Sequence, residues 1–133
     1  MKLQEKVEHW LDIAEYDLET AAAMQNSQRY LYTVFMCQQA VEKLLKALYL
    51  QQKGEEAPRT HNLAYLFNAL NLPDAPEYFD VLGDLNTYYI EGRYPSYKQK
   101  LSKLLDKSTS RKFLVKTQKV FKWLKSQLIL NKP

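Results

Sequence analysis

Residues 35–50, FMCQQAVEKLLKALYL, carry the pattern that most limits what this chain can fold into. Apolar residues recur there at three- and four-residue steps, which is the period of an α-helix with one broad apolar face. That face is formed by Ala40, Val41, Leu44, Leu45, Ala47 and Leu48. The opposite face carries Gln39, Glu42, Lys43 and Lys46. One face of this helix is therefore expected to build a core, and the other is a candidate binding surface.

The same period predicts helices that run before and through this stretch. Apolar steps indicate a first amphipathic helix from Lys2 to about Asn26. The turn residues that follow place the start of the central helix near Ser27 and its end near Lys53, with Gly54 as the stop. A connection this short makes the two helices antiparallel neighbours.

Three further helices are expected in the second half of the chain. A short helix over residues 61–70 would begin after Thr60, a good N-cap residue, and a longer one would run from beyond Pro76 to about Gly92. The last helix is expected to start between Ser102 and Ser110 and to continue to about residue 130. No run alternates as a strand does, so the sequence predicts an all-α, up-and-down bundle of four long helices plus one short helix.

Composition agrees with one helical domain over residues 1–133. Only three glycines and five prolines leave little room for a many-turned β-sheet fold, and 46% of the residues are hydrophobic, which supplies a core. The single cysteine, Cys37, lies among apolar neighbours and is expected to be buried and reduced. No apolar run is long enough for a membrane span and no signal segment is found at the N-terminus. These features predict a cytoplasmic protein.

Charge is divided unevenly along the chain. Residues 98–133 hold eleven Lys or Arg residues against Asp106 alone, a net charge of +10, which leaves −6 for residues 1–97. On the last predicted helix the outer face carries a lysine stripe, which consists of Lys112, Lys116, Lys119 and Lys122. Such a stripe is most often only solvated, but it is also what RNA or an acidic partner would bind, including the acidic first helix of a second copy.

Two other places hold candidate contact residues. In GRYPSY, Pro95 pushes Tyr94 toward an extended geometry, so Arg93 and Tyr94 are expected on a turn, where the arginine can hold a phosphate and the ring can stack. The alternative is that Arg93 bonds the carbonyl groups at a helix end. His61 is expected in the first turn of the short helix, where it either binds a phosphate or only packs against its neighbours.

The polar face of the central helix also has two interpretations. Gln39, Glu42, Lys43 and Lys46 fit a solvated face with an i, i+4 pair between Glu42 and Lys46. They equally fit a site in which Tyr49 stacks a base beside two lysines. Neither a glycine-rich phosphate loop nor a cluster of metal ligands is found, so no metal and no cofactor are expected.

Three segments together resemble the HEPN family, the higher-eukaryote and prokaryote nucleotide-binding domains. They are WLDIAEYDLETAAAM over residues 10–24, QQAVEKLLKALYLQQKGEEAPRTHNL over residues 38–63 and GRYPSY over residues 92–97. The resemblance implies a small all-α domain that is often dimeric and often encoded beside a minimal nucleotidyltransferase. Some branches of the family are ribonucleases in toxin–antitoxin, phage-defence or RNA-processing systems.

The chain departs from the ribonuclease branches of that family in one motif. Catalytic members carry an Arg followed, after four to six residues, by a His. The histidines of this chain are His9 and His61, and its arginines are Arg29, Arg59, Arg93 and Arg111. No pair has the required spacing, so no catalytic residue is assigned, and the resemblance supports the fold well and ribonuclease activity poorly.

These observations favour a HEPN-like nucleotide- or RNA-binding module, a homodimer and the partner of a minimal nucleotidyltransferase in a two-gene toxin–antitoxin or defence-type system. Ligand contacts are assigned first to Arg93, Tyr94 and His61, brought together over the end of the second helix, and second to Lys43, Lys46, Gln39 and Glu42. The alternative is a metal-independent ribonuclease in which His61 and Arg93 serve as the acid–base and phosphate-binding residues. A structural helical adaptor is the third hypothesis.

Overall fold

A computed structural model describes residues 2–92 and 103–129, with burial described for residues 2–89 and 103–129. Within them the helices are α1 (Leu3–Asn26), α2 (Tyr30–Lys53), α3 (Leu63–Asn68), α4 (Pro76–Gly92) and α6 (Lys107–Ser126). The expected all-α bundle of four long helices and one short helix is confirmed. None of the described helices is long and apolar enough to cross a membrane.

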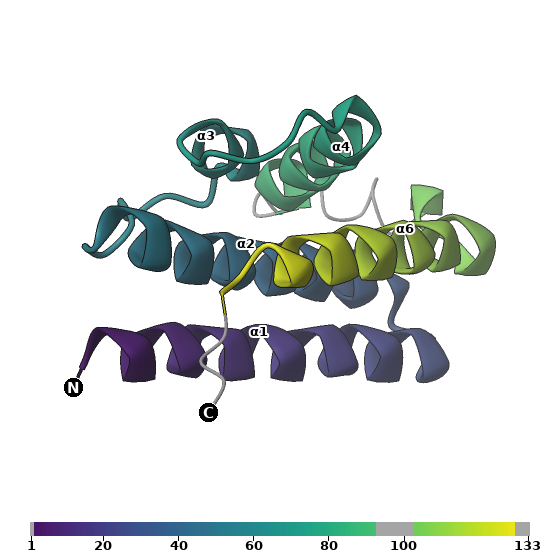
Figure 1. The fold of residues 1–133 in the computed structure, drawn as a ribbon. Coiled ribbons are helices and arrows are strands. Elements are labelled where there is room, and N and C mark those ends of the chain that lie inside the picture. Colours follow the sequence, from purple (N-terminus) through teal and green to yellow (C-terminus); the bar gives the residue numbers. More distant parts are fainter. Residues whose placement is uncertain (1, 93–102, 130–133) are drawn as a thin grey trace.

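Helix α2 is the centre of the bundle. It runs antiparallel to α1 on one side, has α3 and α4 on the other side, and is flanked by α6 (Figure 1). Because neighbours cover several sides of α2, its buried residues are spread around the helix and do not form a single stripe. The fully buried leucines Leu44, Leu45 and Leu48 lie at its middle. Each buried leucine of this kind contributes about 1.5–3 kcal/mol to folding.

The connection between α1 and α2 differs from the prediction. Ser27 does not begin the second helix but follows the end of α1, where its amide donates to the carbonyl of Ala23 and the next amide, that of Gln28, donates to the carbonyl of Gln25. Gln28 then adopts a left-handed backbone with φ of 65°, which ends the helical path. Helix α2 begins only at Tyr30. Its end agrees with the prediction, since Gly54 has φ of 75° and bonds the carbonyl of Leu50.

The start of the short helix was also predicted wrongly. Asn62, not Thr60, is the N-cap of α3, because the Asn62 side chain accepts a hydrogen bond from the amide of Tyr65 at 3.1 Å. The Thr60 hydroxyl instead accepts from the amide of Asn62 at 3.1 Å. His61 therefore precedes the helix and does not belong to its first turn.

Helix α6 begins within the predicted range but ends earlier than predicted. Asp106 caps its start by accepting from the amide of Thr109 at 2.8 Å, and this bond holds the pKa of the Asp106 carboxyl below its usual value. The helix ends at Ser126. The Gln51 side chain of α2 then makes two hydrogen bonds of 2.8 Å, one to the N–H and one to the carbonyl of Ile129. In a continuing helix the N–H of Ile129 would be bonded within the helix and could not bond Gln51.

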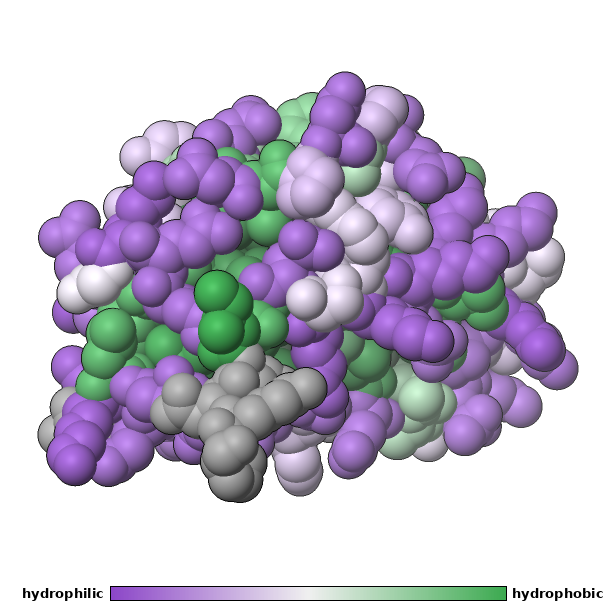
Figure 2. Space-filling view, in the orientation of Figure 1, coloured by the Kyte–Doolittle hydropathy of each residue, from purple (hydrophilic) through white to green (hydrophobic). Residues whose placement is uncertain are grey.

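The inner and outer faces of α6 follow the predicted pattern. Its apolar positions Leu114, Val120, Phe121 and Leu124 are buried, and the four lysines of the stripe are exposed. Hydrophilic side chains cover most of the face seen in Figure 2, and apolar ones gather beside the end of α6. Cys37 is fully buried, as expected, and burial raises the pKa of its thiol to about 12.

Candidate functional site

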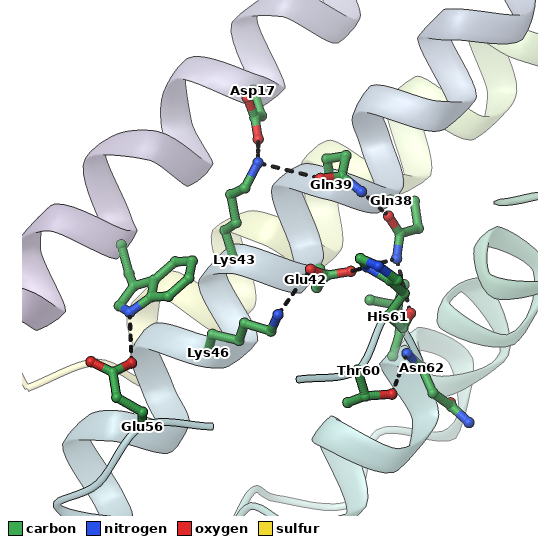
Figure 3. A network of polar contacts seen from close by, with 12 residues as sticks. Asp17, Gln38, Gln39, Glu42, Lys43, Lys46, Glu56, Thr60, His61 and Asn62 are labelled. Atoms are coloured by element: carbon green, nitrogen blue, oxygen red, sulfur yellow. Dashed lines mark hydrogen bonds and ion pairs between the residues drawn. The ribbon is translucent and has the colours of Figure 1, made fainter. Parts of the chain in front are cut away.

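A buried carboxylate, Glu42, is the centre of a polar network in the middle of α2 (Figure 3). Only 3% of Glu42 is exposed. Its oxygens accept from the Gln38 amide at 3.1 Å and the Lys46 ammonium at 3.1 Å, and one of them lies 2.8 Å from Nδ1 of His61. A buried carboxylate is tolerable when its oxygens are paired in this way.

Helical spacing explains why these side chains meet. Gln38, Glu42 and Lys46 follow one another at i, i+4 and i+8, so they form one line along the side of α2. The chain between α2 and α3 passes over this line. There the Gln38 amide donates to the backbone carbonyl of His61 at 3.0 Å. Gln38 thus bonds both the carboxylate and the backbone of the residue that faces it.

The geometry around His61 favours one arrangement of its ring. A carboxylate facing Nδ1 stabilises the tautomer in which Nδ1 carries the proton, which leaves a lone pair on Nε2. The side chain is 49% exposed, so a ligand can reach it. The ring packs against that of Tyr89 of α4 in a tilted arrangement, with 5.3 Å between the ring centroids. Such a histidine can accept a hydrogen bond or a proton at Nε2 while Glu42 holds its orientation.

A second, partly buried ion pair extends the network to α1. The Lys43 ammonium contacts the carboxylate of Asp17 and also donates to Gln39 at 3.4 Å. Gln39 in turn donates to Gln38 at 2.9 Å. A continuous series of polar contacts therefore joins α1, α2 and the connection that leads to α3 (Figure 3).

The solvated interpretation of the polar face of α2 is wrong. Glu42 is buried, and the side chains of Lys43 and Lys46 are only 22% and 14% exposed, because α1 and the connection after α2 cover them. The expected i, i+4 pair between Glu42 and Lys46 is present, but in a largely buried environment, since the carboxylate side chain is 4% exposed and the lysine side chain 14%. Lys46 also lies over the Trp10 ring, 5.8 Å from its centroid.

The predicted placement of His61 over the end of the second helix is also wrong. His61 lies against Gln38 and Glu42, in the middle of α2, so Lys46 needs no extension along the helix to reach this group. Arg93 and Tyr94 lie outside the described residues. Their expected place beside His61 remains a prediction. Among the described residues of α4, Tyr89 contacts the His61 ring.

The lysine stripe of α6 lies between two sets of acidic residues. A cleft of about 390 Å³ between α4 and α6 is lined by Lys116 and Lys119 on one side and by Glu77, Asp80 and Asp84 on the other. A second hollow of about 300 Å³ places Lys122 and Lys125 near Glu15 and Glu19 of α1, and Lys125 pairs with Glu15 at 3.4 Å. The stripe is exposed, as expected, but it is not a purely cationic surface.

Three residues of the network were missed by sequence reasoning, namely Asp17, Gln38 and Tyr89. Asp17 could have been found, because it follows Ala14 by three residues and precedes Ala21 by four, which places a carboxylate inside the apolar stripe of α1. A charge in that position needs a cation from the facing helix. Nothing in the sequence alone marks Gln38 or Tyr89 as neighbours of His61.

Two solved protein structures share the fold of this chain. The structure matches the crystal structure of the protein TT1696 from Thermus thermophilus with a TM-score of 0.81 and 24% identity, over 92% of this chain and 98% of that one. It matches ST0689, an archaeal HEPN homologue, with a TM-score of 0.72 and 24% identity, over 91% of this chain and 96% of that one. No curated protein matches the sequence. Because the HEPN domain model matches residues 7–127, the chain belongs to the HEPN domain family.

Proposed function

We propose that this protein is a nucleotide- or RNA-binding module in which His61 contacts the ligand. The observation that supports this most strongly is the pairing of an accessible histidine with a buried carboxylate, Glu42, at 2.8 Å. Burying a carboxylate costs free energy, and a residue needed only for packing has no reason to incur that cost. A fixed ring whose Nε2 lone pair is free of Glu42 is suited to accept one hydrogen bond, from a base N–H or a ribose hydroxyl.

The lysines of α2 have a supporting role in this proposal. The charge of Lys46 is matched by Glu42, and that of Lys43 by Asp17, so neither ammonium is left over for a ligand phosphate. Gln39 only connects the two pairs. The direct contacts are therefore assigned to His61 and, on the basis of the sequence, to Arg93 and Tyr94, which follow the end of α4 in the chain.

His61→Ala is expected to weaken binding of a fluorescent ATP analogue or a short single-stranded RNA by about 10-fold, the effect of losing one hydrogen bond. Arg93→Ala is expected to do the same or more, since an arginine can make two parallel bonds to a phosphate. Fluorescence anisotropy measures both. His9→Ala and Arg59→Ala are matched controls, because both residues are exposed and lie outside the network. Equal affinities for all four variants would contradict the proposal.

A second candidate is the metal-independent ribonuclease. The contact between Glu42 and His61 favours it, because a carboxylate on Nδ1 prepares Nε2 to act as a general base. His61 would take the proton of a ribose 2′-hydroxyl, the 2′-oxygen would attack phosphorus, and the 5′-oxygen would leave with a proton from solvent. The same RNA, incubated with EDTA and run on a denaturing gel, tests this. RNA that stays intact excludes the ribonuclease and leaves the binding module.

The proposed partners are a second copy of this chain and a minimal nucleotidyltransferase, in a two-gene toxin–antitoxin or defence-type system. Exposed aromatic side chains support association, since Tyr16 is 70% exposed and Tyr65 is 55% exposed. Light scattering at high micromolar concentration is expected to show a dimer. A strictly monomeric chain would remove the homodimer from the proposal.

A further inference from the structure

The polar network of α2 is a series of hydrogen bonds in which donor and acceptor are fixed at each step. It starts at Lys43, whose ammonium group can only donate, so the Gln39 atom that faces it at 3.4 Å is the amide oxygen. The N–H group of Gln39 then points to Gln38 and donates to its oxygen at 2.9 Å. This leaves the N–H group of Gln38 for the opposite side, where Glu42 lies at 3.1 Å (Figure 3).

The far end of the series imposes the same direction independently. The amide nitrogen of Gln38 lies 3.0 Å from the backbone carbonyl of His61 and 3.1 Å from Oε1 of Glu42, and both of these oxygens accept. A turned amide would set its own oxygen against two acceptors. Lys46 donates to the other carboxylate oxygen at 3.1 Å. Glu42 is thus held by groups that only donate to it, and it acts as an acceptor.

These assignments decide which nitrogen of the His61 ring carries the proton. Nδ1 lies 2.8 Å from the same oxygen Oε1 of Glu42, so Nδ1 has to be protonated for this contact to be a hydrogen bond. In the neutral ring the other nitrogen, Nε2, then has a lone pair and no proton. Nε2 can therefore accept a hydrogen bond but cannot donate one. The ionised oxygens of a phosphate have no proton to offer to it.

Aromatic rings continue from His61 along α4 and α2. The Tyr89 centroid lies 5.3 Å from that of His61, Phe35 follows at 5.8 Å from Tyr89, and Tyr32 follows at 5.9 Å from Phe35. Tyr32 is 40% exposed, and Phe35 and Tyr89 are half-buried. Aromatic side chains beside a polar contact are where unpaired bases stack. The surroundings of His61 therefore favour a base over a phosphate.

We propose that His61 selects its ligand by a hydrogen-bond donor, an N–H of a base or a hydroxyl of a ribose, which meets Nε2. This inference rests on the nucleotide-binding function proposed above and names the part of the ligand that the histidine contacts. The amino group of an adenine-like base is the expected donor, because a base stacked on the neighbouring rings brings its edge to His61. Gln38 is a positioning residue, since its amide holds both Glu42 and the backbone of His61.

Nitrogen-15 NMR of the full chain tests the state of the ring without any ligand. At about pH 8, where an ordinary histidine is neutral, His61 is expected to carry its proton on Nδ1. Glu42→Gln is expected to remove this preference, because an amide can turn either its N–H or its oxygen to the ring. A native His61 that carries its proton on Nε2 would overturn the inference.

Gln38→Leu tests the positioning residue in the same spectra. Both states of the His61 ring are expected to appear in this variant, because the backbone of His61 is no longer held against Glu42. The matched control is Gln52→Leu, the same substitution on the same helix, since Gln52 is exposed and bonds the backbone of Asn71 instead. Circular dichroism of each variant checks that the fold is retained. Identical ring states in the two variants would mean that Gln38 does not position His61.

Displacement of a fluorescent ATP analogue identifies the donor group. ATP is compared with purine riboside triphosphate, which lacks the amino group, and with 2′-deoxy-ATP and 3′-deoxy-ATP, which each lack one ribose hydroxyl. Loss of the amino group is expected to weaken binding by about 10-fold, the effect of one hydrogen bond, and loss of either hydroxyl by less than about 2-fold. The reverse order supports the inference too, with a ribose hydroxyl as the donor.

His61→Ala links the preferred nucleotide to the histidine. In this variant ATP and purine riboside triphosphate are expected to bind equally, because the acceptor of the amino group is gone. If the original chain binds all four nucleotides equally and still depends on His61, the inference is wrong and the proposed function stands, since the histidine then contacts a phosphate. If the original chain binds none of them and no RNA, the proposed function fails, and this specificity fails with it.

Discussion

Glu42→Ala is expected to lower the free energy of unfolding by about 3 kcal/mol. The carboxylate is the shared acceptor of Gln38 and Lys46 and lies against His61, and its removal leaves a mostly buried ammonium without its counterion. Removing one partner of a buried pair typically costs about 3–5 kcal/mol, and the 14% exposure of Lys46 places this case at the lower end. Urea unfolding followed by circular dichroism measures the change.

Glu15→Ala is the matched control for that substitution. Glu15 also pairs with a lysine, Lys125, but both side chains of this pair are 41% exposed. Exposed ion pairs contribute about 0–1 kcal/mol, because water solvates each partner when the other is removed. The losses of unfolding free energy in Glu42→Ala and Glu15→Ala are therefore expected to differ by at least about 2 kcal/mol. Equal losses would mean that Glu42 is solvated in solution and that the buried network does not form.

The helices could be predicted from the sequence because their signals are local. The apolar period of α1 ends with the turn residues after Asn26, Gly54 takes the left-handed conformation that ends α2, and Pro76 begins α4. Each of these signals depends on a few neighbouring residues. The cap of α3 was predicted wrongly because Thr60 and Asn62 are both good caps, and only the path of the chain decides between them.

The network around Glu42 could not be predicted in the same way, because its burial is not a local property. A period of 3.6 residues separates two faces of one helix, and it assigned Glu42 and Lys46 to the outer face. In the bundle α2 has neighbours on several sides, so part of that outer face is covered. Whether a polar residue on a central helix is exposed depends on what the rest of the chain places over it.

His61 shows how a residue outside a helix joins such a site. The sequence marks it as a candidate, since it follows a proline-containing connection and is expected in the first turn of the short helix. Its partner, however, is nineteen residues away on α2. Only the return of the chain over the middle of α2 brings the two together. The sequence could therefore name His61 as a candidate, but it could not predict the contact of His61 with Glu42.

Lys43→Ala is expected to lower the free energy of unfolding by about 3 kcal/mol, more than Asp17→Ala. The lysine side chain is 22% exposed and keeps a bond to Gln39, so without Asp17 it can move toward water. The short side chain of Asp17 is only 11% exposed and cannot move in this way. Without Lys43 its carboxylate remains buried and unpaired, which is the more costly state. Urea unfolding of the two variants measures the difference.

A double substitution separates the ion pair from the packing around it. Asp17→Leu with Lys43→Met removes both charges and keeps side chains of similar size, and such exchanges are often neutral or stabilising by about 1–4 kcal/mol. The double variant is therefore expected to be at least as stable as the original chain, although Lys43→Ala alone is not. A double variant as unstable as Lys43→Ala would show that the loss came from packing between α1 and α2. If the double variant is as stable as the original chain, the ion pair is not needed for stability. Its role is then to align α1 against α2, the helix that carries Glu42.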